Sequence, residues 1–376
     1  MRLVPGWAVV WALMIFTPAV RAQDPKAKAQ GPKVDEAKVE IAIRKGIAYL
    51  RTKVAALAPE DGNRPHELVL WTFVRAGLRE GDPDFQTLFK RMMESELERT
   101  YNVALQAMIL EEIDRVKYQP RIWQCAQFLV DNQSKPGDWA YGDPTTINAK
   151  DVPTVTPTKK GAPSAKGAKP PPVRKVPVKK QRDGLKPWGD NSNSQYAALG
   201  LRACHDAGIL IPAEVIEAAI ARWRQAHLKD KGWNYRGQPE PESYGSMTAG
   251  AIGSLAIYLY MLNKPWMTDK DLTAGMEWLA ENFTVTENPK KKDSPPHYYY
   301  FLYALERLGA LSLVDKIGSH EWYPEGANVI LESQQADGSW KHKDRNDLRD
   351  TCFAILFLRR ATRPLVESVD RFHKKP

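Results

Sequence analysis

The chain has 376 residues, of which 43% are hydrophobic and 10% aromatic, which is enough to bury the core of one or two domains. Its formal net charge is +9, but residues 144–182 contain ten lysines and arginines and one aspartate, so the rest of the chain is neutral. Because nucleic-acid binding needs a basic face on the folded part, this distribution argues against nucleic acid as a partner.

Residues 1–22 are predicted to form a secretory signal peptide. A positive charge precedes an apolar run, and Val20 and Ala22 are the small residues expected before a cleavage site. The run is short for a membrane span, although an uncleaved anchor remains an alternative. We therefore expect an exported chain, periplasmic or extracellular, that begins with a disordered polar tail over 23–36.

Two kinds of helix alternate from residue 37 onward. One kind is amphipathic, with a single apolar stripe, as over 85–97. The other is apolar on nearly every side, as over 299–305 and 352–358, and must be enclosed on all sides. The apolar helices begin near His66, Thr100, Asn193, Tyr244, His297 and Asp350.

The apolar helices recur about every fifty residues once 144–182 is set aside, which is the spacing of a repeat protein. Six enclosed helices that alternate with six amphipathic ones predict two concentric rings in a single domain over 37–143 and 183–364. All inner helices then run in one direction, so their N-termini gather at one end, which we call the bowl. The Pro- and Lys-rich segment 144–182 is predicted to be a disordered insert, and 365–376 a C-terminal tail.

A short motif follows three of the outer helices. Residues Gln335 to Trp340 read Gln-Ala-Asp-Gly-Ser-Trp, and degenerate versions end at Trp139 and Trp233. The motif resembles the QW-type repeat of squalene and hopene cyclases and of protein prenyltransferase β subunits. Its glycine is expected to end the outer helix in a left-handed turn, its tryptophan to pack between neighbouring hairpins, and its glutamine to bond to groups at the helix end.

More closely, the run Asp190 to Tyr196 and the start at Tyr244 resemble exported bacterial prenyltransferase or squalene-oxidase repeat proteins. The resemblance implies an all-α fold, the α/α toroid of about six helical hairpins, and it says little about activity. The chain lacks the Asp-x-Asp-Asp motif with which squalene–hopene-type cyclases protonate an alkene. It also lacks the Cys-Gly-Glu-Gln motif of complement-type thioester domains.

A zinc site is the first candidate for chemistry in the bowl. Asp350-Thr351-Cys352 resembles the Asp-x-Cys part of the prenyltransferase zinc site, and on a closed ring the neighbouring inner helices begin at His66 and His297. Asp350, Cys352 and either histidine would supply three ligands and leave an open position. The alternative is that Asp350 caps its helix and Cys352 fills the core.

A ligand site formed by polar and aromatic residues is the second candidate. Tyrosine rings near the inner-helix starts are suited to stack on sugar faces or to shield isoprenoid chains, while packing of a wide ring is the alternative. The polar run 190–193 holds more polar groups than one helix cap requires. The candidate residues are Asp190, Asn191, Asn193, Gln195, Tyr196, Tyr244, Ser246, Thr248, His297, Tyr298 and Asp350.

Two classes of function remain open. In the first, a monomeric exported protein binds a small molecule, an isoprenoid or a glycan in the bowl. In the second, the bowl is an active site of prenyltransferase or cyclase-like type, or cleaves polysaccharide with Glu67 and Asp350 as paired carboxylates. The basic segment 144–182 is a candidate for contact with an anionic envelope surface.

The cysteines carry one further hypothesis. Cys125 and Cys204 lie at similar levels of one predicted hairpin, and an exported protein can form disulfides. A bond between them is therefore one interpretation, and two small buried hydrophobic side chains are the other.

Overall fold

The computed structural model describes residues 33–57, 65–145, 147–148, 150–154, 173–237, 242–291, 297–343 and 347–366. Within these ranges the chain forms twelve α-helices and one pair of two-residue strands. The predicted signal peptide, most of the polar tail over 23–36 and most of the C-terminal tail lie outside the described residues.

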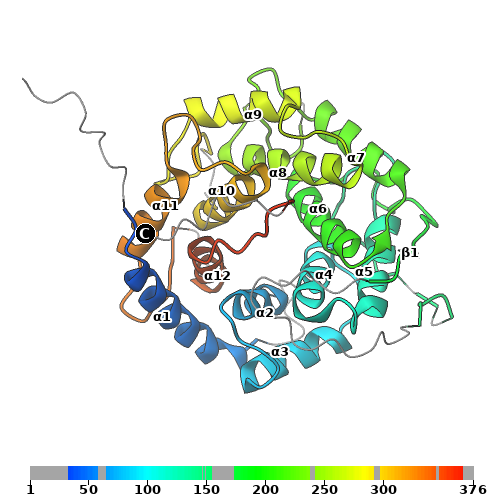
Figure 1. Ribbon diagram of the computed structural model, residues 1–376, viewed down its shortest axis with the longest axis horizontal. Coiled ribbons are helices and arrows are strands. Elements are labelled where there is room, and N and C mark those ends of the chain that lie inside the picture. Colours follow the sequence, from blue (N-terminus) through cyan, green and yellow to red (C-terminus); the bar gives the residue numbers. More distant parts are fainter. Residues whose placement is uncertain are drawn as a thin grey trace, which may run out of the picture.

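The helices form two concentric rings (Figure 1). The inner ring consists of α2 (His66–Arg75), α4 (Thr100–Asp114), α6 (Asn191–Asp206), α8 (Gly245–Met261), α10 (Tyr298–Ser312) and α12 (Asp347–Leu358). The outer ring consists of α1 (Glu36–Val54), α3 (Pro83–Glu94), α5 (Gln119–Asp131), α7 (Ala213–Gln225), α9 (Lys270–Glu281) and α11 (Trp322–Glu332). Each inner helix packs on the next, and α12 packs on α2, so the ring is closed. The predicted α/α toroid is confirmed.

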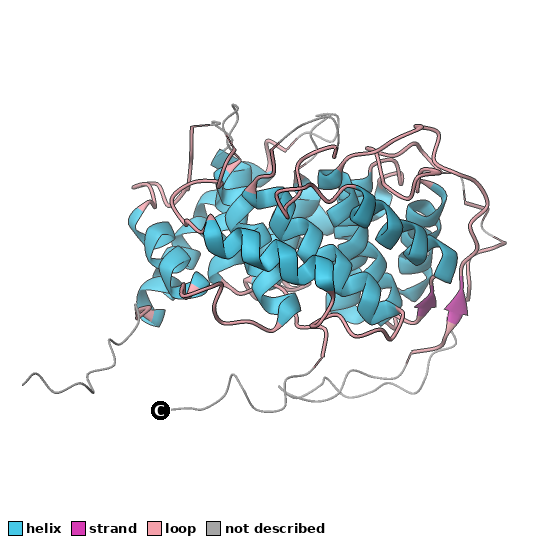
Figure 2. Cartoon of the chain, turned by 90° about the horizontal axis from the view of Figure 1, so that it is seen from above, coloured by secondary structure: helices cyan, strands magenta, loops and turns pink. Residues whose placement is uncertain are grey.

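The burial of each helix follows its sequence pattern. The outer helix α3 buries only Phe85, Leu88 and Met92, the stripe that faces the inner ring. The inner helix α8 is buried along nearly its whole length, because inner neighbours flank it and α7 and α9 cover its outer side. From the side, the helices form one band with the connections at its two faces and the strands near one edge (Figure 2). No described helix is both long and apolar enough to cross a membrane.

Two inner helices begin earlier than predicted. α6 starts at Asn191 and not at Asn193, because Asp190 is the N-cap residue and its carboxylate accepts the backbone N–H of Asn193 at 2.8 Å. α12 starts at Asp347, so Asp350 lies inside the first turn and not at the cap.

The three tryptophan-bearing turns share one geometry. Each indole N–H donates to the carbonyl ten residues earlier in the outer helix, and each backbone N–H donates to a hydroxyl of the following inner helix. The indole bonds are Trp139–Leu129 (2.7 Å), Trp233–Trp223 (2.8 Å) and Trp340–Ile330 (2.7 Å). The hydroxyl partners are Ser194 (3.1 Å), Thr248 (3.0 Å) and Thr351 (2.9 Å). Each tryptophan therefore ties an outer helix to the next inner helix.

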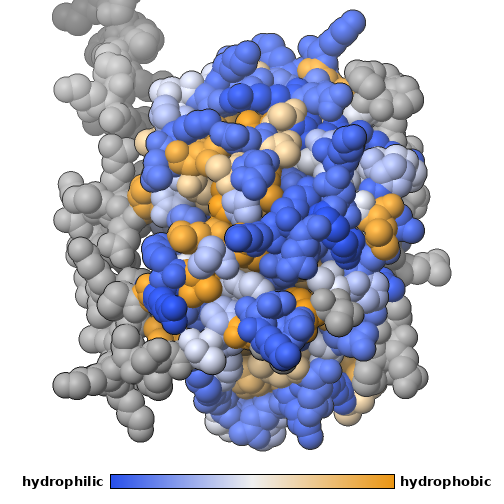
Figure 3. All heavy atoms as spheres, turned by 90° about the vertical axis from the view of Figure 1, so that its right-hand side faces the viewer, coloured by the Kyte–Doolittle hydropathy of each residue, from blue (hydrophilic) through white to orange (hydrophobic). Residues whose placement is uncertain are grey.

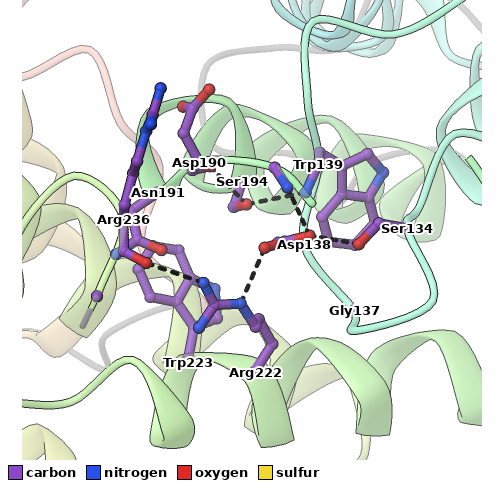
Figure 4. A network of polar contacts seen from close by, with 12 residues as sticks. Ser134, Gly137, Asp138, Trp139, Asp190, Asn191, Ser194, Arg222, Trp223 and Arg236 are labelled. Carbon is purple, nitrogen blue, oxygen red and sulfur yellow. Dashed lines mark hydrogen bonds and ion pairs between the residues drawn. The ribbon is translucent and has the colours of Figure 1, made fainter. Parts of the chain in front are cut away.

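Figure 4 shows the first of these turns, in which Asp138 accepts from the backbone N–H of Gly189 at 2.9 Å and pairs with Arg222 of α7 at 2.8 Å. Gly137 and Gly338 have φ of 102° and 88°, as the left-handed turn requires. The glutamine of the last turn bonds to the helix end as expected, because Gln335 donates to the carbonyl of Ser333, the C-cap residue of α11, at 3.2 Å. Gln334, not Gln335, donates to Ala42 of the next outer helix and to Gly338, because its backbone position matches that of Gln133.

The predicted disorder of 144–182 is wrong for its last part; residues 155–172 lie outside the described residues. Residues 173–184, which we call the strap, run along α5 towards the bowl end. Near the end of the ring opposite the bowl, β1 (Val176–Pro177) pairs in parallel with β2 (Ile209–Leu210), which follows α6. Val176 and Val178 are buried. The strap, whose composition forms no core of its own, is thus held in place by the folded domain.

Four α5 residues spaced four apart hold the strap. They bond to its backbone as Gln119–Arg174 (2.7 Å), Trp123–Pro177 (2.8 Å), Gln127–Lys179 (2.8 Å) and Asp131–Gln181 (2.7 Å). From Trp123 onward, four helical residues rise about 6 Å and the two extended residues that match them about 6.6 Å, so the two periods stay nearly in step. The first interval, from Arg174 to Pro177, spans three residues. For this reason α5 is buried on its outer side as well as its inner side.

The disulfide hypothesis is also wrong, since all three cysteines are free and buried. Burial raises the pKa of the Cys125 thiol to about 12. The thiol of Cys204 lies 3.6 Å from the carbonyl of Ile122. Both side chains act as small hydrophobic residues in the core.

Candidate functional site

The first residues of the inner helices meet inside the ring. Ser192 of α6 lies within hydrogen-bond distance of Tyr101 of α4 (2.6 Å) and of Tyr300 of α10 (2.8 Å). Because α8 stands between α6 and α10 in the ring, the Ser192–Tyr300 contact crosses the interior. Tyr101 and Tyr300 are half-buried, so part of each residue is accessible to solvent. This hydroxyl cluster is the centre of the candidate site.

A buried cation lies below the hydroxyl cluster. Arg307 of α10 is 3% exposed and donates to the side-chain oxygen of Gln195 at 2.6 Å. Its guanidinium lies over the rings of Tyr196, Tyr300 and Tyr303, at 5.5, 6.0 and 4.3 Å from their centroids. Within the described part of the chain, one terminal nitrogen of Arg307 has no hydrogen-bond partner. A cation therefore lies among aromatic rings in the interior.

The tyrosine hydroxyls of this layer remain protonated at neutral pH. Burial, more than any charged neighbour, raises the pKa of Tyr300 to about 12. Burial likewise raises the pKa of Tyr101 and of Tyr196. Each hydroxyl can therefore both donate and accept a hydrogen bond.

A buried carboxylate stands at the start of α2. Glu67 is 1% exposed, accepts the side-chain amide of Asn102 at 2.6 Å, and lies 3.1 Å from the ring nitrogen of His66. Its predicted partner Asp350 accepts the backbone N–H of His342 at 2.9 Å, in the turn that precedes α12. Asp350 thus stabilises the turn that precedes α12, while Glu67 is held by its neighbours in the inner ring.

The zinc hypothesis is not supported. The described residues contain no group of three histidine, cysteine, aspartate or glutamate side chains placed to hold a metal ion. His66 is directed to Glu67, Asp350 to the turn, and the ring of His297 to Tyr300 at 6.4 Å. Cys352 is fully buried, and burial raises its pKa to about 12, which disfavours the thiolate that zinc requires.

The structure separates the other predicted ligand residues into two groups. Gln195 and Tyr196 face the interior beside Arg307. His297 is exposed at the start of α10, and the ring of Tyr244 lies 5.1 Å from the Lys291 ammonium. These four positions remain candidates.

The remaining predicted residues support the connections between helices. Asp190 accepts from Asn193, and burial raises the pKa of its carboxyl group. The others bond to backbone or side-chain groups of the loops: Asn191 to Asn234 (2.7 Å), Ser246 to Asn288 (2.9 Å), Thr248 to Trp233 (3.0 Å) and Tyr298 to Val285 (2.6 Å). Tyr298 was expected to face a ligand, but its hydroxyl is used in packing the connection after α9.

The sequence analysis missed Ser192 and Arg307 as site residues. A signal for Arg307 was present, because Tyr300, Tyr303 and Arg307 are spaced by three and four and so share one face of a helix that had to be enclosed. Ser192 stood in a polar run whose other members are caps, and only the position across from Tyr300 distinguishes it.

A cavity of about 50 Å³ lies at the far end of the ring, opposite the bowl. Trp71 lines it, and the indole of Trp71 donates to Tyr303 at 3.2 Å. Its charged side chains pair with one another, as in Arg75–Glu112 at 2.9 Å and Arg202–Asp206 at 3.4 Å. The cavity is thus part of an ion-paired end layer.

Comparison with known proteins identifies the fold. The chain has a TM-score of 0.54 and 11% identity to a possible member of the GH105 family from Salmonella enterica serovar Paratyphi A, covering 90% of this chain and 96% of that one. It has a TM-score of 0.50 and 11% identity to a variant of the type II terpene cyclase MstE from Scytonema in complex with geranylgeranyl dihydroxybenzoate, covering 87% and 97%. No family model and no curated protein matches the sequence. At this identity the likeness establishes the α/α toroid alone.

Proposed function

We propose that the protein is an exported binding protein whose bowl takes a hydroxyl-rich ring compound, a glycan. The observation that carries the proposal is the cluster of Tyr101, Ser192 and Tyr300, drawn from three inner helices. Protonated hydroxyls that both donate and accept match the hydroxyls of a sugar, and the adjoining tyrosine rings match its apolar faces.

The polarity of the site favours a glycan over an isoprenoid. An isoprenoid chain is best held by a wall of apolar side chains, whereas this site presents hydroxyls, the Glu67 carboxylate and the Arg307 guanidinium. The shared fold is compatible with either ligand, since one similar structure is a terpene cyclase and the other a possible GH105 member. Membership among the prenyltransferase or squalene-oxidase repeat proteins is a further proposal, supported by the common geometry of the tryptophan-bearing turns.

The test is a glycan array followed by calorimetry on the glycan retained most strongly. Tyr300→Phe keeps the ring and removes the hydroxyl, so we expect binding to weaken about tenfold, the effect of one or two lost hydrogen bonds. Tyr298→Phe is the matched control, because it makes the same change on the same helix at a hydroxyl bonded to Val285. Equal affinities for the two variants, or retention of no glycan, would contradict the proposal.

A second candidate is cleavage of the bound glycan. It is favoured by Glu67, a buried carboxylate beside His66 that accepts from Asn102, the residue after Tyr101. A carboxyl group in such surroundings can act as a general acid or base. Release of reducing ends from the bound glycan, abolished in Glu67→Gln while binding persists, would establish this activity; turnover by Glu67→Gln at the native rate would exclude it.

A further inference from the structure

Two large aromatic side chains are exposed beside the bowl. Trp188 is 59% exposed and Tyr141 57% exposed, although every other tryptophan and tyrosine of the described chain is buried or half-buried. Tyr141 follows the first tryptophan-bearing turn, and Trp188 lies in the segment that leads into α6. Tryptophan and tyrosine are enriched at binding interfaces, so two such side chains exposed beside a candidate site are candidates for contact with a ligand.

A bridge joins the two segments that carry these residues. Trp139 and Asp190 form an antiparallel bridge in which the N–H of Asp190 donates to the carbonyl of Trp139 at 3.0 Å. Tyr141 lies two residues after Trp139, and Trp188 lies two residues before Asp190, so the bridge fixes the starting points of the segments that carry both rings. The Tyr235 hydroxyl completes the group, because it hydrogen-bonds both Tyr141 and Asp190. We call Tyr141, Trp188 and Arg236 the rim platform.

The rim platform continues into the bowl. The ring of Tyr141 lies 6.4 Å from that of Tyr101, and the ring of Tyr101 lies 4.6 Å from that of Tyr196. Tyr101 is also the residue that donates to Ser192 in the hydroxyl cluster. A row of aromatic rings therefore leads from the exposed edge to the interior.

The surroundings of the rim platform are basic. The Arg236 side chain is exposed, and its guanidinium lies 5.3 Å from the centroid of the Trp188 ring. The strap and the residues up to Trp188 add exposed cations at Arg174, Lys175, Lys179 and Lys186. Asp183 is the one acidic residue between 173 and 188, and it pairs with Lys180 at 2.9 Å. Viewed from the side of α5 and β1, the surface is mainly hydrophilic, with scattered hydrophobic spots (Figure 3).

We propose that the rim platform and the strap bind a linear acidic polysaccharide, with one sugar ring stacked on Trp188 and Tyr141 and carboxylates of the chain paired with Arg236 and Lys186. The proposal rests on the proposed function, because it names the ligand class of the same bowl and extends it outward. A polymer fits because the strap runs extended along α5 and carries the exposed cations Arg174, Lys175 and Lys179 at successive points of its length.

The same features argue against other anionic partners. An anionic membrane would be bound through a broad apolar face beside the cations, whereas the rim platform offers two ring systems with polar tips. Nucleic acid is a polyanion of another class, and retardation by single-stranded DNA equal to that by the acidic polymers would overturn the choice of a polysaccharide. Ring stacking combined with a few cations is the combination expected for an acidic sugar chain.

The test is native affinity electrophoresis of the full chain in gels that contain polygalacturonate, alginate or hyaluronate, with dextran and pullulan as neutral controls. We expect retardation by at least one acidic polymer, and weaker retardation at high salt. Trp188→Ala and Tyr141→Ala should each lower the affinity about tenfold, the loss expected for one stacking contact. Met267→Ala, at a residue 65% exposed in the connection after α8, is the matched control and should migrate as the native chain does.

Three results would overturn the proposal: no retardation by any of the three acidic polymers, equal retardation by the neutral ones, or retardation unchanged in Trp188→Ala. Sedimentation with phosphatidylglycerol vesicles that depends on Trp188 would also overturn it, in favour of a lipid surface. Failure of the proposed function is distinguishable, because Tyr300→Phe reports on short glycans in the bowl. Loss of polymer binding in Trp188→Ala but not in Tyr300→Phe would support the rim platform by itself.

Discussion

Single residues at the tryptophan-bearing turns decide how closely the two rings can pack. Gly338 lies at φ 88°, and a β-carbon there would lie 2.5 Å from the carbonyl oxygen of Lys45 on α1. Glycine is therefore required at this position for two reasons: the backbone is left-handed, and the next outer helix approaches closely.

The two effects can be measured separately. Gly77 has φ 97°, but a β-carbon at this position would have nothing within 4 Å, so Gly77→Ala should cost only the backbone term, about 1 kcal/mol. Gly338→Ala should cost about 2–4 kcal/mol, since α1 must also move away. Urea denaturation of both variants is the measurement, and equal losses would show that the contact with α1 is unimportant.

At the scale of elements, α5 differs from the other outer helices because the strap covers its outer side. The stripe Gln119, Trp123, Gln127 and Asp131 would be expected to face water in an amphipathic helix, and here it binds the strap backbone. The strap in turn gives α5 a buried environment on both sides. The two elements therefore stabilise each other.

Removing one of these bonds should loosen the strap locally. Gln127→Met removes the amide that donates to Lys179 and to the carboxylate of Asp131, and we expect deuterium uptake over 173–184 to rise at least roughly fivefold, as for the loss of about 1 kcal/mol. Gln124→Met, the same change on the same helix at a residue that contacts Arg121, is the control. Uptake that rises equally in both variants would argue that the strap does not depend on the stripe.

At the scale of the whole molecule, the C-terminal segment closes the end of the ring opposite the bowl. Glu306 of α10 accepts the backbone N–H of Thr362 at 2.9 Å and its hydroxyl at 2.8 Å, and Arg363 pairs with Glu111 of α4. Burial raises the pKa of Glu306 to about 7 and that of Glu111 to about 7.

These raised pKa values predict a pH dependence of stability. Below the unfolded pKa, near 4.5, both carboxyl groups are protonated in the folded and the unfolded chain, and their contribution to stability is fully present. As the pH rises through about 7 the folded chain must ionise buried groups, so this contribution is lost. We therefore expect Tm to fall between about pH 5 and pH 8, and to fall less steeply in Glu306→Gln. Identical slopes in the native chain and the variant would contradict this assignment.

The sequence by itself determined the architecture. Hydrophobic periodicity separates helices that are buried on one side from helices that are buried on all sides, and their strict alternation leaves two concentric rings as the arrangement that buries both. The prediction of inner-helix starts erred by at most three residues, as at Asp347, because acids and amides in a polar run such as 190–193 are nearly equivalent as caps.

Only the tertiary structure decided which polar residues face the interior. The direction of a side chain at a helix start depends on where the neighbouring helix stands, so Ser192 and Tyr300 meet while Tyr298, two residues away, bonds to a loop. The metal hypothesis failed for the same reason, because Asp350 and Cys352 are directed to the turn and the core. The strap depended on the tertiary structure as well: a segment without a core of its own is held by the α5 side chains and by β2, which only the folded ring presents to it.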